Sequence, residues 1–455
     1  MIINKLKYIG VCGLFILNSY NVLAVDKKYD VKTLHKMEES CNDINIVLAT
    51  GEELDLQDLI RLSVCNNPEL KADYLNIEIA KSKKKQAIAE YLPTISGNVS
   101  TNEVYSKKED SKSVDSNTYS AKISLDWLIY DFGGRRARNR IYKNNINIAD
   151  FSYSSKLYDL ILSVNTTYLN LLGAQEILKS AEENEKAFKK SYEESSKKYN
   201  IGMTTLNDKL QAKTQYEEST LEVVNAKNMI EQYSGQLAVL LNLTPKTKFN
   251  LAKPSTNKDI TKLEIENDID KMIGLALKNR TEIKEKQESI NYIENNLKSI
   301  KSELMPKISA SGSFNHNDSW EDNSLYENSG NIGINVSVPL FSGFSKVNKI
   351  TQTKYEYKKA KYALEVTKNI VANEVWTAYQ NYKKSIESYK ISQQILQSAE
   401  ENLKVASKSY SVGKVDIINL LTANSKLAEA KKERITNFYN VLISKANLYR
   451  TIGEM

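Results

Sequence analysis

Apolar and polar residues alternate along residues 119–130, which read YSAKISLDWLIY. A period of two is typical of a β-strand with one apolar face. After a short break, residues 135–199 contain no proline and a single glycine. This stretch predicts one helix of about 65 residues, roughly 100 Å long at 1.5 Å per residue. An average helix has about 11 residues, so a strand joined to so long a helix is the feature that any fold must explain.

The same order of elements occurs twice along the chain. In the first copy we predict a helix over 56–91 interrupted at 66–68, strands over 94–101 and 119–130 with a loop at 106–117, the long helix 135–199, and a return helix over 205–243. In the second copy we predict a helix over 279–305, strands over 307–314 and 331–340 with a loop at 317–330, a long helix over 345–410, and a return helix that ends near 452. We therefore predict two internal repeats, 54–243 and 279–453, joined by a connector at 244–278 that holds at most a short helix.

Large residues recur every seventh position along both long helices, beside a second line of small residues. A repeat of seven makes helices coil around their neighbours, and small residues let them approach closely. The large positions are Leu157, Val164, Leu171, Leu178, Tyr192 and Tyr199 in the first copy, with Glu185 the exception, and Val375, Tyr382, Tyr389, Leu396, Leu403 and Tyr410 in the second, where Lys368 holds the first place of the series. A long intramolecular coiled coil would explain this pattern by itself.

The predicted strands have the length and polarity of strands that cross a membrane. Each has about nine to eleven residues, which spans a bilayer when the strand is tilted. One face is apolar, the other carries polar residues, and Trp127, Tyr130 and Phe341 lie at one end, as an aromatic girdle would. A sheet in lipid leaves no edge unpaired, and four strands are too few to close a barrel, which takes about eight. We therefore predict a barrel built by several copies of the chain; the alternative is a sheet packed on helices in water.

Composition narrows the function by exclusion. The chain has 455 residues, a net charge of +7 and 26% charged residues. Lysines stand beside glutamates along the helices, so we expect solvated helix faces and no nucleic-acid partner. The two histidines, His35 and His316, have no catalytic neighbourhood, and no metal-binding spacing, phosphate loop or nucleophile elbow is present. We expect neither an enzyme nor a bound cofactor or metal.

Residues 1–24 have the features of an export signal. Lys5 and Lys7 precede an apolar stretch at 8–17, and Ala24 offers a small residue before the cut. Residues 25–53 are mixed and polar, which predicts an irregular lead-in. The mature chain would keep Cys41 and Cys65, for which a disulfide and two buried thiols are both open.

Three short motifs at element boundaries resemble those of the TolC family of outer-membrane efflux proteins. They are LIYDFG at 128–133, VPLFSG at 338–343 and YSVG at 410–413. The first two mark the strand-to-helix junctions, at Asp131, Gly133, Gly134, Ser342 and Gly343. The resemblance covers about 54–453 and implies a mainly α fold with a transmembrane β-barrel. It implies a homotrimer whose twelve-stranded barrel in the outer membrane continues into the periplasm as a long α-helical barrel. The implied partners are outer-membrane lipid, a periplasmic adaptor (membrane fusion) protein and an inner-membrane pump.

The resemblance also places a closed entrance at the helix turns farthest from the barrel. Family members hold this end shut with a tyrosine, an arginine and two rings of aspartate. Tyr410 matches the tyrosine, whereas Val415, beside Lys414, stands at the arginine position, and Asn419 and Thr422 stand at the aspartate positions. We therefore expect hydrogen bonds and Asp208 or Asp416 to hold the entrance here. The candidate entrance residues are Tyr199, Gly202, Asp208, Tyr410, Gly413, Asp416 and Asn419, of which the glycines are in the first place helix stops.

The predicted function is an outer-membrane channel of a tripartite efflux or type I secretion system. The alternative is a periplasm-spanning coiled-coil scaffold without a pore, because the heptads and the helix length suit a scaffold too. A scaffold, however, does not need strands of alternating polarity. A drug exporter and a specialised exporter of proteins or adhesins both fit the sequence.

Overall fold

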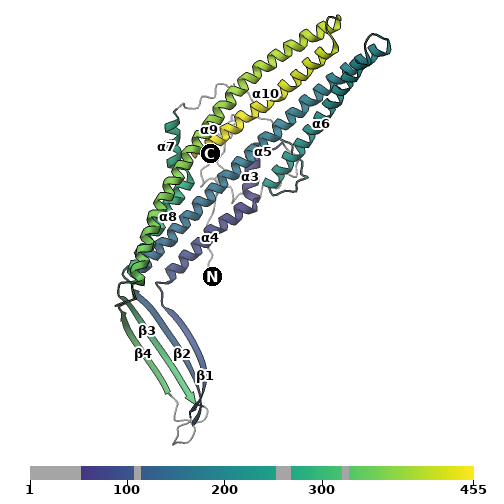
Figure 1. Ribbon diagram of the computed structural model, residues 1–455. Helices are drawn as coiled ribbons and strands as arrows, with labels where there is room; N and C mark the ends of the chain where they lie inside the picture. The colour runs from purple at the N-terminus through teal and green to yellow at the C-terminus, as the bar shows by residue number, and fades with distance from the viewer. Residues whose placement is uncertain (1–52, 107–113, 253–267, 320–326, 455) are drawn as a thin grey trace, which may run out of the picture.

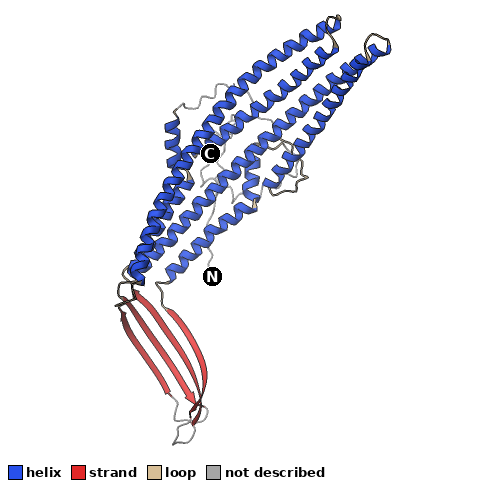
Figure 2. Ribbon diagram, viewed as in Figure 1, coloured by secondary structure: helices blue, strands red, loops and turns tan. Residues whose placement is uncertain are grey.

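The structure, a computed structural model, describes residues 53–106, 114–252, 268–319 and 327–454. The predicted signal peptide at 1–24, nearly all of the lead-in at 25–53, and Cys41 lie outside these residues. The described chain is elongated, with a β-sheet at one end and the tips of two helical hairpins at the other (Figure 1). Figure 2 shows that the sheet and the helices are separate parts that meet at one level.

The four strands form one antiparallel sheet in the order β1–β2–β3–β4. Their bounds are Thr94–Ser106, Val114–Tyr130, Lys307–Ser319 and Glu327–Ser337. The sequence analysis made the strands too short at their outer ends, because polar residues beyond the predicted bounds continue the ladder, with Asn102 opposite Thr118 and Asn317 opposite Glu327. β4 also ends sooner than predicted, two residues before Pro339, which has no N–H to donate to a ladder.

The two long helices are α5, Gly134–Asn200, and α9, Ser345–Ser411, each of 67 residues. Their bounds confirm the predicted helices at 135–199 and 345–410. Each begins after a residue in the left-handed region, Gly133 with φ 89° and Phe344 with φ 61°. This conformation lies at the turn between strand and helix, and glycine adopts it without the strain that a side chain adds.

The return helices are α6, Leu206–Leu240, and α10, Ile417–Ile452, which pack along α5 and α9 as hairpins. The shorter helices complete each half: α3, Leu56–Asn66, and α4, Pro68–Ala89, in the first, and α7, Ile269–Asn279, and α8, Thr281–Ser302, in the second. The lengths agree between the halves, with 11 residues in α3 and α7 and 22 residues in α4 and α8. The predicted connector at 244–278 therefore contains most of α7.

The joint between α3 and α4 was expected from the sequence. Asn67 ends α3 in an extended conformation with ψ 118°, and its side chain accepts a hydrogen bond from the N–H of Leu70 at 3.0 Å. Pro68 occupies the first position of α4, where its missing N–H costs nothing. Arg280 has a similar backbone conformation between α7 and α8, with ψ 129°.

The heptad positions of both long helices that lie nearer the sheet contribute to the helical core, whereas those nearer the tips are half-buried or exposed. Leu157 and Val164 of α5 and Val375 of α9 are fully buried, and Tyr382 is nearly so. One cluster joins α5 to α3, α4 and α6, and a second joins α9 to α7, α8 and α10. Among the described helices, none combines the length and the apolar character that crossing a membrane requires.

Cys65 in α3 is buried and disulfide-bonded. Because Cys12 and Cys41 lie outside the described residues, the pairing of Cys41 with Cys65 stays a prediction.

Candidate functional site

The sheet has one apolar face and one polar face, and no helix of the described chain covers either (Figure 2). Large side chains on the apolar face are 60–95% exposed, namely Ile95, Val99, Ile123, Ile332 and Ile334. The opposite face carries Ser, Thr and Asn side chains together with Lys122 and Asp126, and the hydroxyls of Ser100 and Ser120 hydrogen-bond across it at 2.8 Å. The expected alternative, a sheet packed on helices, is therefore wrong. An exposed apolar surface of this kind marks a contact with lipid or another chain.

The three predicted girdle residues lie at the end of the sheet that joins the helices. The indole N–H of Trp127 donates to the carbonyl of Tyr91 at 2.9 Å, and the Trp127 side chain is 41% exposed. The rings of Tyr130 and Phe132 pack edge-on with their centres 4.8 Å apart, and those of Phe341 and Phe344 pack edge-on with their centres 5.4 Å apart. Rings with an apolar body and a polar tip suit a membrane boundary, but their role as a girdle stays a prediction.

Two buried charged residues lie at the junction between β2 and α5. Asp131 is 6% exposed and Arg135 is 5% exposed. The carboxylate of Asp131 accepts a hydrogen bond from the N–H of Arg135 at 2.6 Å, and the guanidinium of Arg135 donates to the carbonyl of Ile129 at 2.7 Å. Arg138 also reaches Asp131 and forms an ion pair with Glu90 at 2.7 Å.

Gly134 is required at this junction by space rather than by its backbone. A Cβ atom there would lie 2.5 Å from the hydroxyl oxygen of Ser302 and 2.6 Å from Oδ2 of Asp131, both of which are buried. The neighbouring Gly133 has open space around it and is needed for its positive φ.

The junction between β4 and α9 is built with exposed residues. Gly343 and Phe344 both have a positive φ, and the N–H of Ser345 donates to the carbonyl of Ser342 at 3.2 Å. Glu303 takes the place of Glu90 and forms ion pairs with Lys346 and Lys349. The hydrogen bond from Lys346 lowers the pKa of Glu303. These charged side chains are about a quarter to a half exposed.

The two hairpin tips share one backbone motif at the candidate glycines. In the first tip, Gly202 has φ 74°, its N–H donates to the carbonyl of Tyr199, and the N–H of Met203 donates to the carbonyl of Lys198. In the second tip, Gly413 has φ 71°, and the corresponding bonds run from Gly413 to Tyr410 and from Lys414 to Ser409. This pair of bonds ends a helix with a left-handed residue, for which glycine is favoured.

The return helices begin differently. In α6, the hydroxyl of Thr205 accepts from the N–H of Asp208, and the carboxylate of Asp208 accepts from the N–H of Thr205, both at 3.2 Å. The hydroxyl of Thr204 also donates to this carboxylate at 2.6 Å, and this bond lowers the pKa of Asp208. In α10, Asp416 stands at the corresponding N-cap without a side-chain hydrogen bond to the helix. Asp208 is therefore a capping residue, and exposed Asn419 is its counterpart in α10.

One cation joins the two tips. The ammonium of Lys198, at the end of α5, lies 4.0 Å from the centre of the Tyr410 ring, at the end of α9. Tyr410 also packs against a small apolar cluster that spans both hairpins, formed by Phe188, Ala212, Ile417 and Leu421 with Tyr192 and Tyr216. Within the first hairpin, Lys209 lies 5.0 Å from the ring of Tyr199. We call the contact between Lys198 and Tyr410 the tip clasp.

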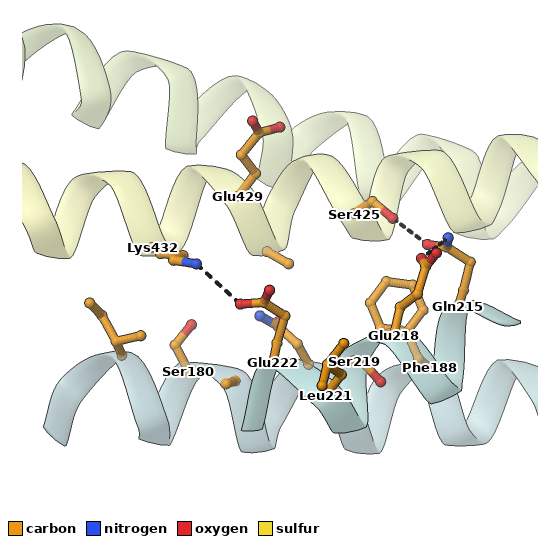
Figure 3. Close-up of a pocket in the computed structure, with 14 residues that line it drawn as sticks. Ser180, Phe188, Gln215, Glu218, Ser219, Leu221, Glu222, Ser425, Glu429 and Lys432 are labelled. Atoms are coloured by element: carbon orange, nitrogen blue, oxygen red, sulfur yellow. Dashed lines mark hydrogen bonds and ion pairs between the residues drawn. The ribbon is translucent and has the colours of Figure 1, made fainter. Parts of the chain in front are cut away.

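A groove between α5, α6 and α10 runs from beside Phe188 toward the middle of the hairpins, with a volume of about 410 Å³. Figure 3 shows side chains of α10 facing those of α5 and α6 across it. Two polar contacts bridge the groove, from Ser425 to Gln215 at 2.8 Å and from Lys432 to Glu222 at 3.1 Å (Figure 3). The hairpins are thus held together near their tips by a small apolar cluster, the tip clasp and a few polar contacts.

A second group of charges lies at mid-height, where α7 meets α8. Arg280 and Arg450 are each about nine-tenths buried, and both donate to the carboxylate of Glu282 at 3.0 Å. Burial opposes the charge on Glu282, but the hydrogen bond from Arg280 and the charge of Arg450 outweigh it and lower the pKa of Glu282 to about 2. Arg450 also binds Asp159 of α5 at 2.8 Å, so this group ties the second half to the first.

The structure brings all seven candidate entrance residues to the tips, at the end opposite the sheet (Figure 1). It adds Lys198 and Lys209, which the sequence analysis did not select. A lysine in the last turn of a helix, as Lys198 is in α5, is expected at any helix C-terminus and does not stand out. It also adds the mid-height charges. Among the described residues, no group of three or more acidic, cysteine or histidine side chains is placed to hold a metal ion.

Similar sequences match this chain over most of its length. The Outer membrane protein TolC of Escherichia coli K12 is 23% identical over 406 residues, which cover 86% of this chain and 80% of that protein. The Alkaline protease secretion protein AprF of Pseudomonas aeruginosa is 20% identical and covers 87% of this chain and 86% of its own. The Probable efflux pump outer membrane protein TtgC of Pseudomonas putida is 23% identical over 423 residues, covering 88% of this chain and 82% of its own.

The architecture alone assigns the chain to a structural class, in which a four-stranded sheet with both faces uncovered is joined to two hairpins of very long helices. Solved structures of outer-membrane channels share it. CusC superimposes with a TM-score of 0.78 at 18% identity, over 88% of this chain and 92% of its own, and OprN with a TM-score of 0.76 at 19% identity, over 88% and 90%. The profile described as Outer membrane efflux protein matches residues 59–243 and again residues 272–454. The chain belongs to this family of outer-membrane proteins, and the expected resemblance to TolC is confirmed.

Proposed function

We propose that this protein is the outer-membrane channel of a tripartite efflux or type I secretion system, a passive duct from the periplasm to the exterior. The observation that carries the proposal is the sheet, which exposes an apolar face and has two unpaired edges, β1 and β4. In lipid, each unpaired backbone group costs several kcal/mol, and four strands cannot close on themselves. Three copies supply twelve strands, enough to close a barrel whose polar face lines a water-filled lumen. The family is one of transport channels rather than enzymes.

Exposed apolar residues on the helices support the same closure. When β4 of one copy pairs with β1 of the next, α9 of the first and α4 of the second become neighbours, because α4 leads into β1 and β4 leads into α9. Both helices expose apolar side chains, namely Leu75, Ile79 and Ile88 on α4 and Tyr355, Tyr362, Val366 and Ile370 on α9. Contact between these two stripes would continue the ring from the barrel into a helical tube.

An internal duplication accounts for the architecture of each copy. The two halves have the same order of elements with matched helix lengths, and the family profile matches each half separately. We keep the proposed repeats at 54–243 and 279–453 with a connector at 244–278.

The tips are the proposed entrance and the site of contact with a periplasmic adaptor, which connects the channel to an inner-membrane pump. They are the tight turns farthest from the sheet (Figure 1), and they expose apolar side chains such as Ile201, Met203 and Val412. The names of the relatives refer to antibiotic and toluene efflux and to secretion of an alkaline protease. We place the cargo of this channel within that range of small molecules and proteins.

The entrance is held closed, in this proposal, by contacts between the hairpins rather than by rings of acidic residues. The tip clasp and the apolar cluster around Tyr410 join the two tips. Asp208 is occupied in capping α6, and the neutral Asn419 and Thr422 stand where related channels carry aspartate. Opening would separate Lys198 from Tyr410 while each hairpin stays folded.

Single-channel recording of the purified protein in a planar lipid bilayer tests the channel. We expect discrete conductance steps. A periplasm-spanning scaffold without a pore would give no conductance and would show the proposal to be wrong.

Substitution of a tip glycine tests the entrance. Gly413→Arg adds a large cation at a positive φ and should impair export while trimers still form. Gly274→Arg is the matched control, because Gly274 lies in α7 with open space around it and without a positive φ. Export by Gly413→Arg at the level of the control would contradict the assignment.

A further inference from the structure

The hairpin tips carry more positive than negative charge. Residues 197–209 and 408–416 together contain five lysines and two aspartates, a net charge of +3 per chain. The lysines are Lys197, Lys198, Lys209, Lys408 and Lys414. Because each copy in the proposed trimer contributes the same tip, these charges would surround one narrow opening.

The two aspartates offset part of this charge, and the net charge of +3 already counts them. The carboxylate of Asp208 already accepts hydrogen bonds from the hydroxyl of Thr204 and the N–H of Thr205, so it is directed back onto its own helix. Asp416 stands at the N-cap of α10, where the positive end of the helix dipole partly compensates a negative charge. Further into α10, the exposed Asn419 and Thr422 are neutral.

Two of the five ammonium groups are fixed in place. Lys198 is held over the ring of Tyr410 and Lys209 over the ring of Tyr199. A cation over an aromatic face keeps its full charge, and it no longer samples the wide range of positions of a free lysine. Fixed charges of one sign in a narrow passage focus the electric field and raise the local concentration of ions of the opposite sign.

We propose that the entrance of this channel is electropositive and admits anionic cargo in preference to cationic cargo. The inference rests on the proposed function and names the charge class of the cargo. The lysines of the tip act as the determinants of specificity, by attracting anions and repelling cations where the passage is narrowest.

The test measures ion preference in planar bilayers under a potassium chloride gradient. For the full-length protein, the reversal potential should correspond to a chloride permeability greater than that of potassium. In the double variant Lys197→Glu, Lys414→Glu, the net charge of the tip changes from +3 to −1 per chain, and the preference should invert. Both lysines are exposed, so the variant should fold and insert as the parent does. Lys354→Glu, at an exposed position of α9 far from the tips, is the matched control and should leave the ratio unchanged.

A second measurement needs no variant. Tripolyphosphate added on the side of the tips should block the current of the unmodified channel, whereas spermine at the same concentration should not. Conductance with a preference for potassium, or with block by spermine and not by tripolyphosphate, would overturn this inference and leave the channel itself established. Absence of any conductance would overturn the proposed function and this inference with it.

Discussion

The two halves of this protein have the same order of elements, but their buried charged groups lie at different heights along the helices. The first half places its buried pair, Asp131 and Arg135, at the junction of strand and helix. The second half places Arg280, Arg450 and Glu282 at mid-height. The equivalent positions in the other half are exposed: Lys346 faces Glu303 at the second junction, and Lys156 pairs with Glu69 in the first half.

This difference separates the features that both halves need for the fold from those that only add stability to one half. Both halves keep the left-handed residues before α5 and α9 and the left-handed glycines at the two tips, because the chain cannot turn at these points without them. The charged groups differ between the halves in their level and in their exposure. The exposed second junction, with Phe341 76% and Phe344 66% exposed, is free to contact lipid or the next copy of the chain.

The largest effect is expected from the first-half anchor. Arg135→Ala removes a buried guanidinium that lies 3.9 Å from the carboxylate of Asp131 and donates to the carbonyls of Glu90 and Ile129. Loss of this buried charge from its pair should cost about 3–5 kcal/mol in the free energy of unfolding. Lys346→Ala, the equivalent change at the exposed second junction, should cost less than about 1 kcal/mol. Urea unfolding of both variants, followed by tryptophan fluorescence, measures the difference. Equal losses would show that the two junctions are anchored alike.

The mid-height anchor should give the second-largest effect and a dependence on pH. The pKa of Glu282 is about 2 in the folded chain against an ordinary value of 4.5, a difference that corresponds to about 3 kcal/mol of stability at neutral pH. Because the folded pKa is the lower one, this stability is present above pH 4.5 and is lost as the pH falls toward 2.

Glu282→Gln should therefore lower the free energy of unfolding at pH 7 and flatten its decline between pH 4.5 and 2. Glu69→Gln, at the equivalent exposed position, should change the free energy of unfolding at pH 7 by less than about 0.5 kcal/mol. The pair is measured by urea unfolding at several pH values. An unchanged acid profile in Glu282→Gln would show that other groups are responsible.

Substitution of the N-cap residues of the return helices should give a smaller difference in stability between the two halves. Thr205→Ala removes a side chain that accepts a hydrogen bond from the N–H of Asp208, which should cost about 1 kcal/mol. Asp416→Ala removes a side chain that makes no such bond, and the loss should be a few tenths of that. Local hydrogen exchange at the first turns of α6 and α10 reports the two changes. If Asp416→Ala increased exchange in α10 more than Thr205→Ala increased it in α6, the conclusion that Thr205 is the stronger N-cap would be wrong.

The smallest effect on stability is expected at the tip clasp, which connects the halves. Lys198→Met keeps the length of the side chain but removes its charge, and a partly exposed contact of this kind contributes about 0.5–1 kcal/mol. The variant should increase the open fraction in single-channel records. Lys209→Met, which removes a similar contact within one hairpin, should leave the open fraction unchanged. A closed channel in Lys198→Met would show that the clasp does not hold the entrance.

Local patterns in the sequence were enough to place the main elements. The period of two at 119–130 can be seen within one stretch of chain, and so can the absence of proline and the near absence of glycine over 135–199 and 345–410. The joint at Pro68 and the stops at Gly202 and Gly413 depend on single residues with restricted or permissive backbones. The capping role of Asp208 was also accessible, because Thr205 and Asp208 have the spacing of a capping box.

Other features depend on residues that are far apart in the sequence. Lys198 meets Tyr410, and Glu282 meets Arg450, and no short-range pattern pairs such positions. The outer ends of the strands were missed because pairing with a neighbouring strand, as between Asn317 and Glu327, needs no apolar side chains. Most of α7 was assigned to the connector, since its 11 residues form too short a stretch to stand out.

The central claim is that the sheet cannot be completed within one chain and is closed by identical copies in the membrane. The mass of the protein extracted in detergent, measured by light scattering with the detergent contribution subtracted, tests this most directly. We predict the mass of three chains, with the complex stable only in detergent or lipid. A single chain that remains monodisperse in buffer without detergent would contradict the account.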